Sequence, residues 1–356
     1  MEMIPLFKPY MPVELPELNS ILHSGALAYG KWGKLFEQKL GEYIGETRIT
    51  TVNSYNSAML VALAVIGVKP GDEIIASPMS CLASNQPFAT QNLKVVWADI
   101  DPKTGTLSPD SVKSKITSKT KAIFHNHFCG YLGYIDEINQ IGKEKGIVVV
   151  DDAIEAFGSE YKCNWIGNTG TDMTIFSFQT IRLPNTIEGG AIAFNSNDFY
   201  QKAILIRDYG IDRNRFRDEL GEISPNCDIT FPGYGATLSD VNSYLGVLQM
   251  QKIEELIQIQ RKNALKWENL ISDKIINFEF LNTTSNKRPN YWVFGLLSSD
   301  KIELIKQFRK EGFYASGVHL PNTYYSAFGT YESLSGINEF YSKFLAIPCG
   351  WWLDKK

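Results

Sequence analysis

At 356 residues, the chain is long enough for one large domain and a smaller one. Lys and Arg number 35 against 39 acidic residues, a net charge of −4, so no broad basic field is available to hold nucleic acid or an anionic membrane. The five cysteines are scattered and include no C-x-x-C pair, which argues against a disulfide framework or a structural zinc site and is typical of a reducing cytoplasm.

The N-terminal stretch "MEMIPLFKPYMPVELPEL" contains four prolines and no continuous apolar run, so we expect no signal peptide. No run approaches the length of a membrane span. We therefore expect a cytoplasmic protein.

The first two thirds of the chain alternate short β-rich runs with helical stretches. Six runs predict buried strands, at residues 72–78, 94–101, 121–128, 146–153, 174–178 and 190–194. Residues 56–68 and 135–146 predict helices, the second ending at a C′ glycine. Continuous apolar strands separated by helices predict an α/β fold with a parallel or mixed sheet covered on both faces.

From residue 234 to residue 270 the pattern predicts one long amphipathic helix. This helix should connect a large domain, residues 1–245, to a small C-terminal domain within residues 246–356. The small domain is expected to contain "NYWVFGLL" (290–297), a helix at 300–312 and an aromatic-rich segment that follows it.

Several common sites lack their sequence patterns. No G-x-G-x-x-G follows the first strand, and no P-loop is present, so dinucleotide and nucleoside-triphosphate sites have little support. The four histidines lack H-E-x-x-H spacing, and we predict no metal site.

Polar residues at strand ends remain as candidates, because ligands bind beyond the carboxyl ends of parallel strands. They are Asp152 after "GIVVV", His127 after "KAIF", Ser177 in "IFSF", and Asn53, Ser54, Asn56 and Ser57 before a helix. A helix N-terminus favours an anion, and a buried aspartate can stay ionised beside a cationic nitrogen. Together they suit a ligand with a phosphate at one end and a basic ring nitrogen at the other, such as pyridoxal phosphate (PLP). Taken singly, each also fits an ordinary structural role, as a strand-end cap, a buried donor or a core histidine.

Over nearly its whole length the chain resembles the DegT/StrS-type nucleotide-sugar aminotransferases, which are fold-type I PLP enzymes. The segments that carry the resemblance occur in the expected order: "YGKWGKLFEQKLGEYIG", "GVKPGDEIIASPMSCLASNQPFATQNLKVVWADID", "AIFHNHFCGYLGYIDEI", "VVVDDAIEAFGSEY", "FSFQTIRLPNTIEGGAIAF", "DYGIDRNRFRD", "PGYGATLSDVNSYLGVLQMQKIEEL" and "GVHLPNTYYSAFG". The resemblance implies a large domain with a mostly parallel sheet and a smaller C-terminal α/β domain.

The resemblance also implies site residues. The family's pyridinium aspartate corresponds to Asp152, its phosphate-binding serine to Ser177 and its strand-end histidine near the cofactor to His127. The Schiff-base lysine, in S-F-x-x-x-K before E-G-G, corresponds to Arg182.

Other positions depart from the family pattern. The phosphate loop usually reads Gly-Thr where this chain has Tyr55-Asn56, and the ring-stacking aromatic corresponds to Leu82. A glutamine or histidine beside the ring oxygen is replaced by Glu155, and an asparagine that reaches a neighbouring subunit's phosphate falls at Gly235. So many changes favour natural divergence over a single engineered substitution.

Arg182 changes the expected chemistry. A buried lysine can lose its proton and attack the cofactor's aldehyde, whereas arginine stays protonated and is a poor nucleophile. Conventional lysine-dependent transamination should therefore be lost.

Three functions remain open. In the first, PLP or pyridoxamine phosphate (PMP) is held non-covalently by Asp152 and Ser177, with Asn56, Ser57 and Leu82 at its site, and the protein acts on a keto-sugar nucleotide in polysaccharide or secondary-metabolite biosynthesis.

In the second, the same scaffold acts on a nucleoside-diphosphate sugar without PLP. Arg182 and the loop arginines Arg213, Arg215 and Arg217 would hold the diphosphate, because guanidinium binds phosphate oxygens bidentately. The three loop arginines fit an ordinary salt-bridged surface turn equally well. His127 and Glu155 would serve as acid and base, and His319 would contact the substrate.

In the third, the chain is a non-catalytic partner of an active paralogue. We expect a homodimer with its active site at the subunit interface in the first two cases.

Overall fold

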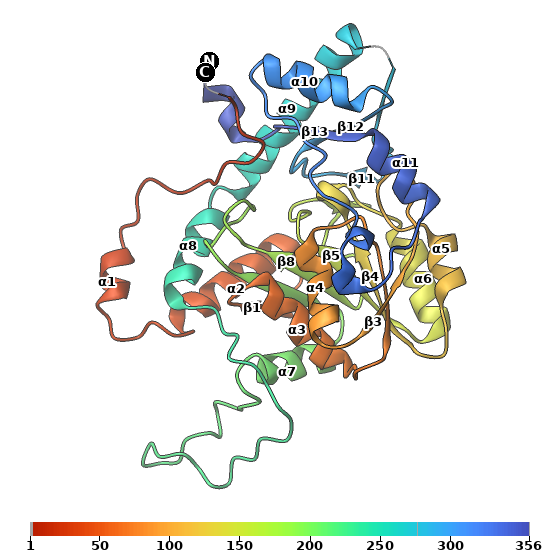
Figure 1. Ribbon diagram of the computed structural model, residues 1–356. Coiled ribbons are helices and arrows are strands. Elements are labelled where there is room, and N and C mark those ends of the chain that lie inside the picture. The colour runs from red at the N-terminus through yellow and green to blue at the C-terminus, as the bar shows by residue number, and fades with distance from the viewer. Residues whose placement is uncertain (1–2, 276, 356) are drawn as a thin grey trace.

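The computed structural model describes residues 3–275 and 277–355. A seven-stranded sheet lies at its centre, in the order β1-β9-β8-β5-β4-β2-β3 (Figure 1). The strands are β1 (Ile49–Val52), β2 (Glu73–Ala76), β3 (Lys94–Trp97), β4 (Thr120–Asn126), β5 (Val148–Ala153), β8 (Met173–Ser177) and β9 (Gly190–Phe194). Strands β3, β2, β4, β5 and β8 are parallel, and β9 runs antiparallel to both of its neighbours. All six predicted strands are confirmed, as is the predicted α/β fold; β1 was not predicted.

Helices cover both faces of this sheet. They are α2 (Lys31–Ile44), α3 (Tyr55–Ile66), α4 (Leu82–Thr90), α5 (Pro109–Lys115), α6 (Ile135–Lys145) and α7 (Asn197–Ile206). The short helix α1 (Leu18–Leu22) lies apart from the sheet and packs on residues 244 and 245. Both predicted helices, 56–68 and 135–146, are confirmed, and α6 ends at Gly146 in the left-handed conformation (φ +64°) that favours glycine.

Alternate strand residues divide the core between the two faces. Val150 and Ile175 pack in the cluster that includes Met59 of α3, whereas Phe176 packs in the cluster of Phe36 from α2. Because side chains alternate along a strand, residue 152 lies on the same face as Val150, toward α3.

The prediction of one long helix over 234–270 is wrong. The segment forms α8 (Asp240–Met250) and α9 (Ile253–Lys274), and the Ser239 side chain caps α8 by accepting a hydrogen bond from the backbone N–H of Asn242. Apolar periodicity continues across the break, so the pattern alone did not reveal it.

The C-terminal part contains a second sheet of β10 (Phe278–Phe280), β12 (Phe294–Ser298) and β13 (Phe344–Ile347), with α10 (Lys301–Lys310) and α11 (Ser335–Lys343). A third small sheet joins β6 (Glu160–Tyr161) and β7 (Asn164–Trp165) to β11 (Lys287–Arg288), and so ties the two parts together. Short 3-10 turns complete the chain: η1 (Phe128–Gly130), η2 (Asn322–Tyr324), η3 (Ser326–Phe328) and η4 (Trp351–Lys355).

The N-terminal segment packs on this C-terminal part. The backbone N–H of Ile4 donates to the carbonyl oxygen of Gly312, and the N–H of Tyr314 donates to that of Ile4. Trp352 Nε1 also donates to the carbonyl oxygen of Pro5 at 2.9 Å, so the N-terminal and C-terminal segments lie together in Figure 1. Within the described ranges, every helix is too short or too polar to cross a membrane.

Candidate active site

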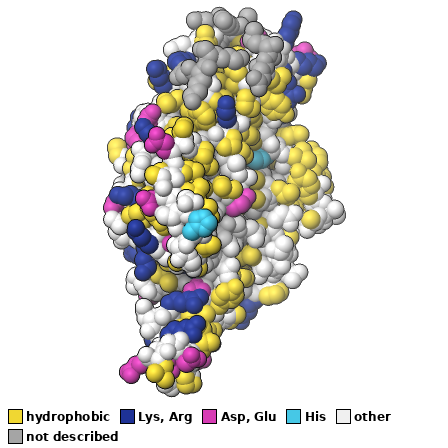
Figure 2. All heavy atoms as spheres, turned by 90° about the vertical axis from the view of Figure 1, so that its left-hand side faces the viewer, with side chains coloured by type: hydrophobic (Ala, Val, Ile, Leu, Met, Phe, Trp, Pro, Cys, Tyr) yellow, Lys and Arg dark blue, Asp and Glu magenta, His cyan; other side chains and the backbone are white. Residues whose placement is uncertain are grey.

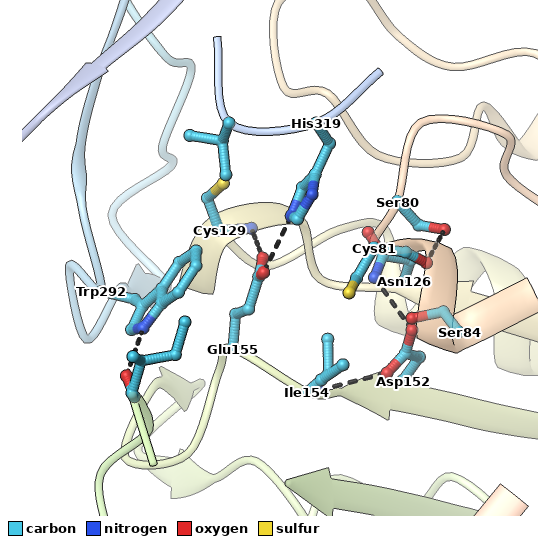
Figure 3. Close-up of polar contacts among 12 residues, drawn as sticks. Ser80, Cys81, Ser84, Asn126, Cys129, Asp152, Ile154, Glu155, Trp292 and His319 are labelled. Atoms are coloured by element: carbon cyan, nitrogen blue, oxygen red, sulfur yellow. Dashed lines mark hydrogen bonds and ion pairs between the residues drawn. The ribbon is translucent and has the colours of Figure 1, made fainter. Parts of the chain in front are cut away.

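Asp152 lies at the carboxyl end of β5, buried and surrounded by hydrogen-bond donors (Figure 3). Asn126, its neighbour on β4, donates from Nδ2 to Asp152 Oδ2 at 3.0 Å, and the N–H of Ile154 donates to Oδ1 at 3.2 Å. The Ser84 hydroxyl, on α4, makes a further hydrogen bond to this carboxylate.

The fourth donor is Tyr55, the first residue of α3. Its hydroxyl donates to Asp152 Oδ1 at 2.7 Å and lies 3.3 Å from Ser84 Oγ, and the residue is only 5% exposed. Burial, followed by the Asp152 charge, raises the pKa of Tyr55 well above its usual value, so the phenol keeps its proton and remains a donor.

This arrangement does not fit the ring nitrogen of PLP. A carboxylate offers about four acceptor sites, and four donors from the chain itself already reach Asp152. Leu82, at the position expected to stack on the ring, is 38% exposed at the start of α4.

The predicted phosphate contacts are also used within the chain. Ser54 Oγ caps α3 by accepting from the N–H of Ser57 at 3.0 Å, and Ser57 Oγ donates to Asn53 Oδ1 at 2.6 Å. Asn56 is exposed on the first turn. Ser177 is buried at the end of β8, where its Oγ accepts from the N–H of Gln179 at 3.4 Å.

The loop between β8 and β9 holds Arg182 in place. The N–H of Arg182 donates to the carbonyl oxygen of Gln179 at 2.7 Å. The loop ends at Gly190, where the backbone passes close to that of Phe176. Only glycine fits there, because a Cβ at residue 190 would lie 2.9 Å from the carbonyl oxygen of Phe176.

The Arg182 guanidinium is 7% exposed and lies between an acid and an aromatic ring. Its Nη2 is 3.4 Å from Glu155 Oε1, and its central carbon is 4.2 Å from the centroid of the Trp292 ring. Trp292 stacks in turn on Phe7, with centroids 4.2 Å apart. Arg182 Nε and Nη1 have no hydrogen-bond acceptor among the described residues. The cavity that Arg182 shares with Ser177 has a volume of about 10 Å³, room for a single water molecule.

Glu155 links Arg182 to His319, and Figure 3 shows its contact with the histidine. Its Oε1 lies 2.9 Å from His319 Nε2, and its Oε2 accepts from the N–H of Cys129 at 2.8 Å. Burial alone would raise the pKa of Glu155, but His319 and Arg182 outweigh it and lower that pKa, so the carboxylate is ionised. Atoms of Cys129, Glu155 and His319 lie close enough to hold a metal ion, but the Arg182 cation opposes a second cation there.

The structure does not bring His127 to this cluster. Its Nε2 lies 3.3 Å from Asp151 Oδ1, and its Nδ1 accepts from the N–H of Gly133 at 3.2 Å. His125 Nδ1 lies 3.1 Å from the same Asp151 oxygen. Because successive strand residues alternate, Asp151 and these histidines lie on the sheet face opposite to Asp152.

Arg213 and Arg215 also lie outside the cluster. Both belong to the exposed segment between α7 and α8, which protrudes at the bottom of Figure 1. Arg213 binds Asp208 with two short contacts, 2.5 and 2.6 Å. Within one chain, the contacts of Arg213 are therefore local.

The structure adds three residues to the site that the sequence did not single out as ligands or partners: Tyr55, Asn126 and Trp292. In the sequence, Tyr55 stands where the family usually has glycine. That large aromatic side chain is the one sequence feature that indicates a role for Tyr55 in the site. Nothing in "NYWVFGLL" distinguished Trp292 from a strand residue, because its contact with Arg182 joins positions 110 residues apart, the difference between 292 and 182.

Comparison with known proteins agrees with this architecture. The family model described as the DegT/DnrJ/EryC1/StrS aminotransferase family matches residues 12–355. An uncharacterized protein of Methanocaldococcus jannaschii, MJ1066, is 28% identical over 340 residues, which cover 92% of this chain and 87% of that protein.

Solved structures give the same result. The sugar aminotransferase CalS13 of Micromonospora echinospora superposes with a TM-score of 0.92 at 25% identity, covering 99% of this chain and 96% of that one. Spr1654 of Streptococcus pneumoniae, solved in a PLP form and a PMP form, shares the fold with a TM-score of 0.88 at 22% identity, covering 99% of this chain and 95% or 94% of those chains. The chain therefore belongs to the DegT/DnrJ/EryC1/StrS aminotransferase family.

Proposed function

We propose that this protein binds a nucleoside-diphosphate sugar in the site of its family and acts on it without PLP or PMP. The observation that carries the proposal is the pairing of Arg182 with Glu155, together with its stacking on Trp292, at the position where relatives supply an amine nucleophile. A permanently charged guanidinium cannot replace that amine. Membership of a sugar aminotransferase family supports the substrate class.

Glu155 and His319 are the acid–base pair of this proposal, and His319 takes the part that sequence analysis gave to His127. Glu155 engages Nε2 of His319, and the histidine side chain is 15% exposed. A carboxylate that fixes one ring nitrogen of a histidine leaves the other available for proton transfer. Arg182 is buried beside a cavity that holds a single water molecule, so it would act through Glu155, whose ionised form it favours. Proton transfer at a carbon beside a carbonyl is a reaction that these groups can perform unaided.

Ligand binding tests this proposal. Purified protein should show a rise in melting temperature with UDP- or dTDP-linked sugars, because a ligand that binds only the folded state stabilises it. His319→Ala should abolish the rise, and Arg182→Ala, which acts through Glu155, should reduce it. Arg48→Ala is the matched control, since Arg48 forms an Arg–Glu pair with Glu46 away from the site. Stabilisation by PLP with no response to any sugar nucleotide would refute the proposal.

A non-catalytic role beside an active paralogue is the second candidate, and exposed apolar side chains would serve association either with such a partner or with a second copy of this chain. The protruding segment exposes Leu220, Ile223 and Ile229, with Leu220 86% exposed. Figure 2 views the side on which α1 lies and shows hydrophobic side chains spread widely over it. Exposed apolar area of this kind favours association with a second chain.

The oligomeric state separates these possibilities. A homodimer in light scattering, with sugar-nucleotide binding of its own, supports the first function and the expected homodimer. Stable complex formation with a co-expressed, lysine-bearing member of the family, in place of self-association, supports the second.

A further inference from the structure

We propose that the Tyr55 side chain occupies the position of a cofactor ring and excludes PLP and PMP, independently of the replacement of lysine by arginine at residue 182. The inference deepens the proposed loss of cofactor chemistry, and it does not depend on which sugar nucleotide binds.

The path of the Tyr55 side chain carries the inference. Tyr55 begins at the first turn of α3, beside Asn56 and Ser57, which sequence analysis assigned to a ligand's phosphate. Its hydroxyl ends at Asp152, which was assigned to the ligand's ring nitrogen, at a distance of 2.7 Å. The side chain thus spans the two groups that a phosphate-bearing pyridine was expected to connect.

The chemistry of the two rings also corresponds. Phenol and pyridinium are both six-membered aromatic rings with one polar atom that can donate a hydrogen bond to a carboxylate. Tyr55 packs in the same core cluster as Met79 and Ile154, so its ring lies in apolar surroundings. A second ring could reach Asp152 only if Tyr55 left.

The hydrogen-bond donors at Asp152 all belong to the chain itself. The groups that act on this carboxylate are neutral: Ser84, Tyr55, Asn126 and the N–H of Ile154. Burial raises the pKa of Asp152, and these donors offset the rise only in part.

If Tyr55 excludes the cofactor, replacing Arg182 with lysine should not by itself restore the binding of PLP. Arg182→Lys returns the nucleophile but leaves Tyr55 at Asp152. Only a variant that also removes the phenol, Tyr55→Gly with Arg182→Lys, vacates a ring-sized space and supplies the amine.

Four proteins test this: wild type, Arg182→Lys, Tyr55→Gly, and the double variant. Each is incubated with PLP, freed of unbound PLP by gel filtration, and assayed for bound PLP by absorbance and by release into acid. We expect no retained PLP in wild type or in Arg182→Lys, and the visible absorbance of lysine-bound PLP in the double variant. Tyr55→Phe in the Arg182→Lys background is the matched control, since it keeps the ring but not the hydroxyl, and it should still exclude PLP.

Three results would overturn the inference. They are stoichiometric PLP on wild type, lysine-bound PLP in Arg182→Lys with Tyr55 intact, and a folded double variant that takes up none. Circular dichroism establishes folding, and Tyr55→Ala replaces Tyr55→Gly if glycine prevents it. Crystals of wild type soaked in PLP give an independent test, in which a pyridine ring at Asp152 with Tyr55 displaced contradicts the proposal. Sugar-nucleotide binding, measured on the same samples, reports separately on the proposed function.

Discussion

The guanidinium of Arg182 lies against the Trp292 ring, 4.2 Å from its centroid, while the same group pairs with Glu155. Phe7 stacks on the same tryptophan. Three segments far apart in the sequence therefore accommodate this arginine. Such surroundings indicate that the chain is adapted to an arginine at residue 182.

Replacement of Arg182 by alanine should destabilise the protein. Breaking a buried ion pair leaves Glu155 with His319 as its remaining charged partner, so we expect a loss of about 3 kcal/mol in the free energy of unfolding. Urea denaturation measures it. Arg48→Ala removes a more exposed Arg–Glu pair and should cost less than about 1 kcal/mol. Equal losses in the two variants would show that the buried Arg182–Glu155 pair stabilises the fold no more than an exposed ion pair does.

The support beneath Trp292 can be tested at Phe7. The two rings stack with an interplanar angle of 18°, and Phe7→Ala removes this contact together with part of the core. We expect a loss of about 2 kcal/mol in the free energy of unfolding, and a smaller one for Phe7→Leu, which keeps apolar volume. An unchanged thermal midpoint in Phe7→Ala would mean that the N-terminal segment does not hold Trp292.

The sequence predicted the sheet well because its strands are short apolar runs bounded by helices. Strand ends indicated Asp152 and Ser177 as candidates, whereas Glu155 and Arg182 were assigned only through the family resemblance. The sequence could not predict that Tyr55 reaches Asp152, because a side-chain direction depends on packing between α3 and β5. His127 and Asp152 end neighbouring strands, yet alternation sends the His127 ring to Asp151, on the opposite face.

Cys81 offers a chemical probe of the charges in the site. Burial, and then the Glu155 carboxylate, raises its pKa to about 11, whereas Arg182 acts in the opposite direction. Because the thiolate is the reactive form, iodoacetamide at pH 8 should label exposed Cys163 well before Cys81.

Two variants should change, in opposite directions, the rate at which iodoacetamide labels Cys81. Glu155→Gln removes a negative charge that opposes the thiolate and should speed labelling, whereas Arg182→Ala should slow it. Peptide mass spectrometry after timed quenching measures both rates. Changes of the same sign would indicate altered access to Cys81 and not altered charge.

Acid should weaken the protein through His125, on the other face of the sheet. Burial lowers the pKa of this histidine, assisted by His127 and Lys287, and the Asp151 contact offsets the effect only in part. A histidine whose pKa is lower in the folded state than its unfolded value of 6.5 binds its proton more readily when unfolded. Its contribution to stability is therefore complete above pH 6.5 and is lost as the pH falls from 6.5 toward the folded value, by up to about 1.4 kcal/mol per pH unit.

Urea denaturation at pH 7.5, 6.5 and 5.5 (roughly the window set by the unfolded pKa) should show this decline in wild type and in His23→Gln, which alters an exposed histidine. His125→Gln should flatten it, and an unchanged slope in that variant would assign the acid sensitivity to other groups.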